Sequence, residues 1–348
     1  MIETLSDVQV EVLKHLQEGI PLVKEPFKHL AEKIGIEEEH FISIIKQLKD
    51  QKIIRQISPI YDTKSLGYDS SLVAFRVKGD VDSAAGIIST HPGVSHNYLR
   101  TDSFNLWFTI AVPPDSSLGL EKTVEFLAGK TGVEDYVILK TVKLYKIGVK
   151  LDFGKMDEKE ENNNGKKNTK LDLTPEDKQI IKVTQEDIPL VSRPFQYFSD
   201  ILGIDEDELI NRLSVFHETG VMRRFAAILY HRKAGFKANG MTVWKVPEEK
   251  VDEVGYTLAS YRAVTHCYKR TTNEKWQYNL FSMIHAKTRE ELEEFVGRLS
   301  EETGIKEYRI LYSTKEYKKK RIKYFSDEFY KWEEDAKNGG DINSGLKN

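Results

Sequence analysis

Residues 94–100 read Val-Ser-His-Asn-Tyr-Leu-Arg, and residues 264–270 read Val-Thr-His-Cys-Tyr-Lys-Arg. Val, His, Tyr and Arg occupy alternate positions in both stretches, and alternate side chains of a β-strand share one face. A half-buried strand normally turns Val, Ile or Leu inward, whereas this face carries an imidazole, a phenol and a guanidinium. We expect a surface for a flat anionic ligand rather than a solvated sheet face, because the pattern occurs twice. Its members are His96, Tyr98 and Arg100 in the first copy and His266, Tyr268 and Arg270 in the second.

The two stretches belong to a longer internal duplication. Ile20-Pro21-Leu22-Val23 recurs as Ile188-Pro189-Leu190-Val191, an offset of 188 − 20 = 168. The histidines of the two strands are separated by 266 − 96 = 170 residues. A repeat of this length indicates duplicated domains rather than the short units of a solenoid. Residues 154–171 are mostly Lys, Glu, Asn and Gly and predict a flexible linker between the halves.

The hydrophobic pattern predicts the same order of elements in each half. Ser6 caps a first helix, Pro26 begins a second, and a third runs from about Glu37 with an apolar stripe. A short strand pair then follows, over Ile53–Ile57 and the residues after Pro59, which completes a winged helix-turn-helix. The remainder alternates strands and helices in the order βαββαβ, which is the ferredoxin-like arrangement. The predicted elements of this part are strands at Ser71–Val77, Val94–Arg100, Leu106–Val112 and Val133–Leu139 with helices at Val81–Ser89 and Leu118–Lys130, and in the second half strands near Met241–Val246, Val264–Lys269, Tyr278–Ile284 and Ile305–Leu311.

The predicted fold class is therefore α+β, with two tandem units that each join a winged helix-turn-helix to a ferredoxin-like domain. The expected boundaries are 1–68 and 69–153 in the first half, the linker 154–171, 172–236 and 237–325 in the second half, and a C-terminal helix and tail at 326–348. We expect the two halves to pair within one chain, and the sequence leaves further association of chains open.

Composition limits the classes of function. The formal net charge is −3, so no overall basic field indicates nucleic acid or an anionic membrane. The single cysteine, Cys267, excludes an internal disulfide and an all-cysteine metal site within one chain, and it suits a reducing cytoplasm. No apolar run approaches the roughly 18–20 residues of a membrane span, and the N-terminus lacks the pattern of a signal peptide. These features predict a soluble cytoplasmic protein without a membrane partner.

The order of domains resembles the Lrp/AsnC transcription regulators, whose ferredoxin-like part senses small effectors. A helix that enters a DNA groove should begin with neutral or basic residues. The third helices instead begin Glu37-Glu38-Glu39-His40 and Asp205-Glu206-Asp207-Glu208. Acidic residues in a first turn also suit the helix dipole, but carboxylates facing a groove would repel the duplex. No nucleic-acid partner is expected.

More specific motifs resemble the siroheme decarboxylases, which are Lrp/AsnC-like proteins built from two related subunits or from a fusion of them. The motifs are Ile-Pro-Leu-Val before Pro-Phe, the segment 229–236, the Val-x-His-x-Tyr-x-Arg strand, and Tyr278-Asn279-Leu280-Phe281. The resemblance implies a fused carboxy-lyase that removes the C12 and C18 acetate carboxyl groups of siroheme. Its product, 12,18-didecarboxysiroheme, would serve haem or denitrification-haem synthesis. No cofactor is required, since the substrate carries the iron. The alternatives are a tetrapyrrole-responsive regulator and a non-catalytic haem-binding protein.

Siroheme carries carboxylates around a flat ring, so its site needs cations at the rim and aromatic or apolar groups beside the plane. Arginine's planar fork suits carboxylates, and a histidine could supply the proton that replaces carbon dioxide. The predicted catalytic residues are His231 and His266, either of which could instead be the axial ligand of the substrate iron. The predicted substrate-binding residues are Arg223, Arg224, Arg232, Tyr268, Lys269, Arg270, Trp276, His96 and Arg100.

The halves differ around their His-Tyr-Arg strands. His231 aligns with Thr63, Lys269 aligns with Leu99, and the second half has a longer loop that holds Trp276. These differences predict one competent site, with the chemistry at residues 266–270 and the copy at 94–100 as its scaffold. The basic run 317–321 is predicted as a solvated helix face, with a secondary possibility that it folds back over the sheet toward the ligand.

Overall fold

The computed structural model describes residues 5–147, 159, 171–230 and 238–339. The chain forms two compact units, and each combines parts of both sequence halves. The helix-turn-helix unit comprises Met1–Tyr68, Lys166–Arg232 and Lys323–Ser326, and the barrel unit comprises Asp69–Gly165, Lys233–Ile322 and Asp327–Asn348. Among the described residues, no helix is both long and apolar enough to cross a membrane.

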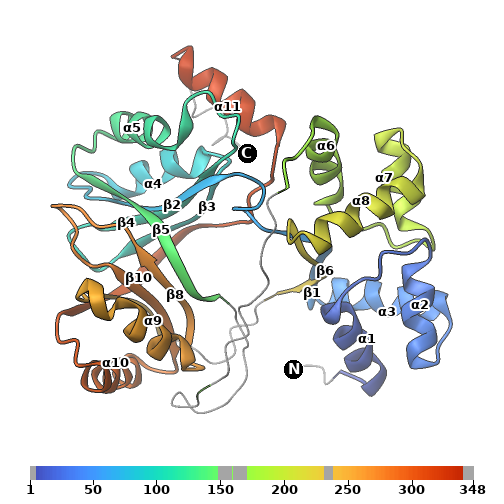
Figure 1. Ribbon diagram of the computed structural model, residues 1–348, viewed down its shortest axis with the longest axis horizontal. Helices are drawn as coiled ribbons and strands as arrows, with labels where there is room; N and C mark the ends of the chain where they lie inside the picture. The colour runs from blue at the N-terminus through green and yellow to red at the C-terminus, as the bar shows by residue number, and fades with distance from the viewer. Residues whose placement is uncertain (1–4, 148–158, 160–170, 231–237, 340–348) are drawn as a thin grey trace. The chain divides into compact units, whose positions relative to one another are not determined.

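The helix-turn-helix unit contains the three helices that the sequence predicted in each half. Ser6 caps the first of these with a reciprocal capping box to Gln9, as predicted from its position. Gly35 and Gly203 end the second helix of each half with φ of 73° and 68°, a left-handed conformation that favours glycine. The helices of this unit are α1 (Asp7–Glu18), α2 (Pro26–Ile34) and α3 (Glu38–Asp50), then α6 (Pro175–Thr184), α7 (Pro194–Leu202) and α8 (Glu206–Glu218) (Figure 1).

The predicted strand pair after the third helix is wrong. One continuous strand, β1 (Ile54–Tyr61), runs through Pro59 and pairs antiparallel with β6 (Met222–Leu229) of the other half. Proline is tolerated there because a two-stranded sheet leaves one edge of each strand unpaired, so the missing N–H removes no ladder bond. The sequence signals a turn at Pro59, but pairing across the halves overrides it. This ladder joins the two helix-turn-helix parts into one unit.

Further contacts between the halves repeat the same symmetry. The N–H of Ile20 donates to the carbonyl of Phe225 at 2.6 Å, and the equivalent N–H of Ile188 donates to that of Ile57 at 2.8 Å. The first turns of α3 and α8 also take part. Lys24 Nζ lies 2.8 Å from Asp207 Oδ2, and Ser192 Oγ donates to Glu38 Oε2 at 2.9 Å. Acidic residues at these helix ends therefore contact the other half of the chain.

The barrel unit contains strands from both halves in one closed sheet. The strand order around the barrel is β10-β3-β4-β2-β5-β8-β9-β7, so each half supplies one continuous side of it. The strands are β2 (Asp69–Phe75), β3 (Val94–Arg100), β4 (Leu106–Val112), β5 (Tyr136–Ile147), β7 (Ala238–Trp244), β8 (Val264–Arg270), β9 (Leu280–Ala286) and β10 (Tyr308–Lys319). The helices are α4 (Val81–Thr90), α5 (Gly119–Thr131), α9 (Val251–Ser260), which the 3-10 turn η1 (Glu248–Lys250) precedes, α10 (Arg289–Thr303) and α11 (Asp327–Lys337).

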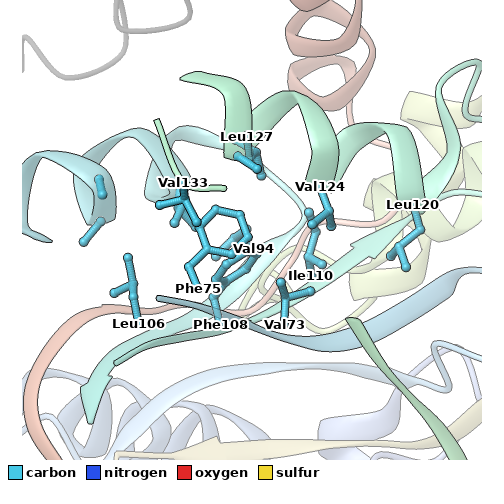
Figure 2. Packing of buried hydrophobic residues seen from close by; sticks show 14 of the residues in the cluster. Val73, Phe75, Val94, Leu106, Phe108, Ile110, Leu120, Val124, Leu127 and Val133 are labelled. Carbon is cyan, nitrogen blue, oxygen red and sulfur yellow. The ribbon is translucent and has the colours of Figure 1, made fainter. Parts of the chain in front are cut away.

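Helices cover the outer faces of the barrel (Figure 1). Against the first half, α4 and α5 pack on outward-facing apolar residues of β2 and β4, and Figure 2 shows Val73, Phe75 and Phe108 among them. A separate cluster buries Trp244, Leu280 and Ile284 under α9 and α10. The inner face of the barrel has a third cluster, with five aromatic and seven other apolar residues, which we call the inner aromatic cluster. It contains Leu72, Ala74, Phe104, Trp107, Val137, Leu139, Met241, Val243, Trp276, Tyr278, Phe281 and Leu311.

Two strands are longer than predicted, and their extra residues close the barrel. β5 continues to Ile147 and pairs there with β8, while β10 continues to Lys319 and pairs with β3. Each extension therefore borders the His-Tyr-Arg strand of the opposite half. The prediction of a helix over the basic run 317–321 is wrong for Tyr317, Lys318 and Lys319, because β3 supplies a strand edge that no neighbouring residue in the sequence reveals.

The predicted C-terminal helix is present as α11, which packs on the helix layer of the first half. Phe329, Trp332 and Ala336 join the apolar cluster under α4 and α5. The Glu333 carboxylate accepts hydrogen bonds at the start of α5 from the hydroxyls of Ser116 and Ser117 at 2.5 and 2.7 Å, and from two backbone N–H groups. These bonds hold the pKa of Glu333 at about 2, although burial alone would raise it. Most of the predicted linker, 154–171, lies outside the described residues.

Candidate ligand site on the inner face of the barrel

The two His-Tyr-Arg motifs form two side-chain ladders with nearly the same internal geometry. In the first ladder (His96, Tyr98 and Arg100) the imidazole and phenol rings stack with centroids 6.1 Å apart and planes at 24°. The second ladder (His266, Tyr268 and Arg270) has values of 6.2 Å and 19°. The guanidinium lies 5.3 Å from the tyrosine ring centroid in the first ladder and 4.9 Å in the second. The predicted sharing of a face is confirmed.

The backbone beside each histidine is irregular in the same way. A register shift occurs between Val94 and His96 where β3 pairs with β4, and between Val264 and His266 where β8 pairs with β9. Such bulges re-aim neighbouring side chains. The residue inside each shift then contacts the imidazole, since Ser95 Oγ lies 2.9 Å from Nδ1 of His96 and Thr265 Oγ1 lies 3.0 Å from Nδ1 of His266.

The ladders lie on the inner face of the barrel and on opposite walls. Tyr98 pairs with Trp107 and Tyr268 with Phe281, and both partners belong to the inner aromatic cluster. The strands β3 and β8 are four positions apart in the closed strand order. Burial lowers the pKa of His266 most, and His285 and His96 contribute to the same lowering, which brings the pKa to about 4, so this imidazole is neutral at pH 7. The near-neutral pKa that the sequence argument required of an acid is therefore not that of His266, and His231 lies outside the described residues.

Arg100 is buried and Arg270 is partly buried, and neither guanidinium has a carboxylate partner among the described residues. Among the described residues, neither Arg100 nor Arg270 forms an ion pair, and the Nε of each is buried without a hydrogen-bond partner. Their Nη1 atoms donate 3.1 Å bonds to the carbonyls of Leu311 and Leu139, respectively. Burial lowers both pKa values to about 10, so both groups remain charged at neutral pH. Buried charges in proteins are normally paired, and an anionic ligand would supply the missing partner.

The ladders differ in the strand that borders them. Residues directly opposite each other in an antiparallel pair share a face. Opposite Arg270, Tyr268 and His266, strand β5 places Thr141, Leu144 and Ile147. Opposite Arg100, Tyr98 and His96, strand β10 places Ser313, Glu316 and Lys319.

This difference changes both the polarity and the bonding of the ladders. Tyr98 donates a 3.1 Å hydrogen bond to Glu316 Oε2, which also raises the pKa of the phenol together with burial. Lys319 and burial lower the pKa of His96. On the other wall, Leu144 and Ile147 are 37% and 39% exposed, an unusual exposure for apolar residues on the inner side of a barrel. Sequence reasoning missed these bordering residues, because pairing of β5 with β8 and of β10 with β3 joins segments from different halves.

Two other predicted residues in the barrel unit lie away from the ladder face. Lys269 points to the helix side of β8, where its ammonium pairs with Glu248. Trp276 is 3% exposed and its Nε1 donates to the carbonyl of Tyr278 at 3.1 Å. It packs against Phe104 and Trp107 in the inner aromatic cluster, so it supports the barrel near the ladders.

The remaining predicted residues belong to the helix-turn-helix unit or are not described. Arg223 is paired with Asp62, a carboxylate whose pKa the pairing lowers despite burial. Arg224 donates a 3.3 Å bond to the carbonyl of Gln17 and borders an open hollow of about 540 Å³ on α1. His231 and Arg232 lie outside the described residues. His285 of β9, which is not among the predicted site residues, is close enough to His266 to lower its pKa.

Comparison with known proteins agrees with this architecture. A family model described as AsnC-like ligand binding domain matches residues 65–146 and 233–318. A second model, described as siroheme decarboxylase NirDL-like HTH domain, matches residues 10–55 and 177–223. Both models match twice, once in each half, as the internal duplication requires.

A siroheme decarboxylase of Hydrogenobacter thermophilus is 49% identical over 323 residues, which cover 92% of this chain and 96% of that protein. The chain belongs to the siroheme decarboxylase family. The crystal structure of the siroheme decarboxylase NirDL is 42% identical, with a TM-score of 0.81 and coverage of 95% of this chain and 98% of that one. The same protein has been solved in co-complex with an iron-uroporphyrin III analogue.

Membership of the siroheme decarboxylase family confirms the resemblance, the α+β class and the repeated helix-turn-helix and AsnC-like domains expected from the sequence. The beta subunit of a siroheme decarboxylase from Methanosarcina barkeri is 42% identical over 147 residues, which are 97% of that subunit and 42% of this chain. One half of this chain thus corresponds to a whole subunit, and the chain is a tandem fusion of two related subunits.

Proposed function

We propose that this chain is a carboxy-lyase that removes the C12 and C18 acetate carboxyl groups of siroheme to give 12,18-didecarboxysiroheme. The carrying observation is the pair of guanidinium groups on the inner face of the barrel, each with a buried Nε that has no hydrogen-bond partner and each beside a tyrosine, in a chain of the siroheme decarboxylase family. A substrate with carboxylates around a flat ring meets both requirements of this face. Its anions pair with Arg100 or Arg270, and its plane contacts the rings.

The second ladder carries the chemistry in this proposal. Decarboxylation breaks the bond between the acetate methylene carbon and its carboxylate, carbon dioxide departs, and the electron pair stays on the methylene group beside the pyrrole. A proton then adds to this carbon and gives a methyl group. The step needs no oxidant and no added cofactor if the conjugated macrocycle delocalises the charge. Arg270 holds a carboxylate and Tyr268 packs at the edge of the ring.

His266 has two candidate roles. As the acid, its imidazole must be protonated, and carboxylates of the bound substrate would raise its pKa from about 4 because they favour the cation. As an axial ligand of the substrate iron, it must be neutral, and its pKa of about 4 makes it neutral at pH 7. His231 remains a candidate for the other role on the grounds of sequence alone.

Residues outside the second ladder contribute less directly. His96 and Arg100 line the opposite wall of the barrel. Trp276 packs in the inner aromatic cluster, whose Trp107 and Phe281 border the two ladders. Arg232, Arg223, Arg224 and Lys269 remain proposed contacts of the substrate rim. Three of these four have protein partners in the structure, since Arg223 contacts Asp62, Lys269 contacts Glu248 and Arg224 contacts the Gln17 carbonyl. These three would have to exchange those partners for substrate carboxylates.

The proposal includes no nucleic-acid partner and no membrane. The acidic starts of α3 and α8 are engaged in contacts between the two halves, through Glu38 with Ser192 and Asp207 with Lys24. A helix end used in this way offers carboxylates rather than cations to a phosphate backbone. We place the enzyme in the cytoplasm, where a reduced thiol such as buried Cys267 persists.

The test is anaerobic incubation of purified protein with siroheme under reducing conditions, followed by mass spectrometry. Loss of two carboxyl groups is expected, with the singly decarboxylated tetrapyrrole as a transient species. Recovery of unchanged siroheme would contradict the proposal. A DNA shift that is sequence-specific and persists at raised salt would instead support a regulator, and a stable Soret band without turnover would support a haem-binding protein.

A further inference from the structure

The end of β5 distinguishes the second ladder from the first. Leu144 and Ile147 lie opposite Tyr268 and His266, on the same face of the sheet, and more than one third of each side chain is exposed. Apolar residues on an inner sheet face are normally covered by the core. These two lie instead beside the stacked rings of Tyr268 and His266, on the ladder that carries the Arg270 cation. Their exposure is consistent with a surface that a ligand covers.

The equivalent positions at the first ladder have the opposite chemistry. Glu316 and Lys319 replace Leu144 and Ile147 in the register. Glu316 accepts a hydrogen bond from Tyr98, and Lys319 is close enough to His96 to lower its pKa. A carboxylate at this point repels the carboxylates of an anionic tetrapyrrole, and two charged groups would have to lose water to contact its plane.

We propose that Leu144 and Ile147 form the apolar seat for one face of the macrocycle, and that Glu316 and Lys319 exclude the macrocycle from the first ladder. This inference rests on the proposed function for the identity of the ligand. The first half of the chain thus supplies the seat for the ladder of the second half, so neither half alone contains the complete site. One tetrapyrrole binds per chain.

The shape of the apolar seat suits a flat macrocycle better than a linear ligand. Opposite residues across an antiparallel pair have Cβ atoms roughly 5 Å apart. Leu144 and Ile147 are three residues apart, and the register shift between Leu144 and Lys146 places them opposite Tyr268 and His266, which are two residues apart on one face of β8. Leu144, Ile147, Tyr268 and His266 therefore present one continuous apolar and aromatic surface. Arg270 and Thr141 lie at its end, where Arg270 Nη1 donates to Thr141 Oγ1 at 3.0 Å and can meet a rim carboxylate.

The experiment substitutes the residues that border one ladder with the residue types that border the other. Binding of iron uroporphyrin is measured by absorbance titration. The double variant L144E/I147K gives the second ladder the border of the first, and at least tenfold weaker binding is expected. The reciprocal variant E316L/K319I should keep wild-type affinity at the second ladder and should bind a second tetrapyrrole at the first, so a single bound tetrapyrrole in this variant would overturn the exclusion. The control V191E/I201K makes the same chemical change at residues 48% and 55% exposed in the helix-turn-helix unit, and it should also bind as wild type.

Wild-type affinity in L144E/I147K would overturn the seat, as would two tetrapyrroles bound per wild-type chain. A tenfold loss in E316L/K319I would place the macrocycle at the first ladder and would also overturn it. If L144E/I147K does not fold, the milder L144S/I147T variant must weaken binding, while its melting curve stays that of the wild type. Siroheme turnover by the wild type separates the two proposals. If tetrapyrrole binding depends on Leu144 and Ile147 but the wild type does not turn over siroheme, the proposed function is refuted and the apolar seat is supported. If the wild type turns over siroheme and L144E/I147K does so equally well, the function is supported and the apolar seat is refuted.

Discussion

The two ladders of the barrel have the same residues and nearly the same geometry, yet their surroundings differ. Both stack a histidine on a tyrosine, with centroids 6.1 and 6.2 Å apart, and place a guanidinium over the same ring. The first is bordered by Glu316 and Lys319, and the second by Leu144 and Ile147. The comparison shows that duplication preserved the motif, while the strand that borders each copy is supplied by the other half.

The largest difference between the ladders is expected when each of the two histidines is substituted separately. His266→Gln should lower kcat/KM for siroheme by at least about 100-fold, because it removes a proton donor or an iron ligand, and proton donors typically contribute 10²–10⁴-fold. His96→Gln, the matched change at the first ladder, should cost less than about fivefold. Steady-state turnover under anaerobic conditions measures both. Equal losses would show that the ladders act together and would contradict a single competent site.

The arginines provide the next comparison. Arg270→Met should weaken siroheme binding by roughly 10–100-fold, since a charged hydrogen bond to a carboxylate is worth about 1.5–3 kcal/mol. Arg100→Met should have a smaller effect on binding, because that guanidinium lies beside the ladder that Glu316 borders. Absorbance titration gives the dissociation constants, and urea unfolding checks that both variants fold. A larger loss for Arg100→Met would assign the substrate carboxylates to the first ladder.

Acid should destabilise the barrel through His266. Its pKa is about 4 in the folded chain against an ordinary 6.5, so below pH 6.5 the unfolded chain binds a proton that the folded chain does not. This contribution lowers the free energy of unfolding as the pH falls from 6.5 to 4, by about 2 kcal/mol at pH 5. His266→Gln should remove this part of the pH dependence, measured by urea unfolding at pH 8 and pH 5. His91, with a pKa lowered to about 3 by burial, should keep a remaining dependence in the variant. An unchanged difference between the two pH values would contradict the assignment.

The C-terminal helix α11 packs on the helix layer of the first half. Substitutions in α11 should have the smallest effect on activity. Glu333→Gln removes the charge that accepts four hydrogen bonds at the start of α5 and should lower the free energy of unfolding by about 1–2 kcal/mol. Siroheme turnover should stay within about twofold, because α11 packs on the outer helices and not on the ladders. Glu334→Gln, at the exposed neighbouring position of α11, is the matched control and should change neither quantity. A large loss of turnover in Glu333→Gln without a loss of stability would connect α11 to the site.

Local signals in the sequence predicted many elements correctly. The strand at Val94–Arg100 and that at Leu106–Val112 have the predicted bounds. The cap at Ser6 is confirmed, because it depends on residues three positions apart. The predicted strand pair of the wing is wrong because Pro59 indicates a turn in the sequence alone. In the structure Pro59 lies within β1, which pairs with β6. The run 317–321 failed similarly, since its strand conformation for Tyr317–Lys319 depends on pairing with β3.

The sequence by itself determined the duplication, the α+β class, the family resemblance and the sharing of a face by His, Tyr and Arg. These follow from local periodicity and from motifs, which need no knowledge of long-range contacts. Only the tertiary structure decided what borders each ladder. Residues such as Ile147 and His266 are separated by 266 − 147 = 119 positions, and their pairing follows from closure of a barrel by strands of both halves. Because hydrogen bonding between strands is made by the backbone, side-chain pattern alone could not show which strand would close on which.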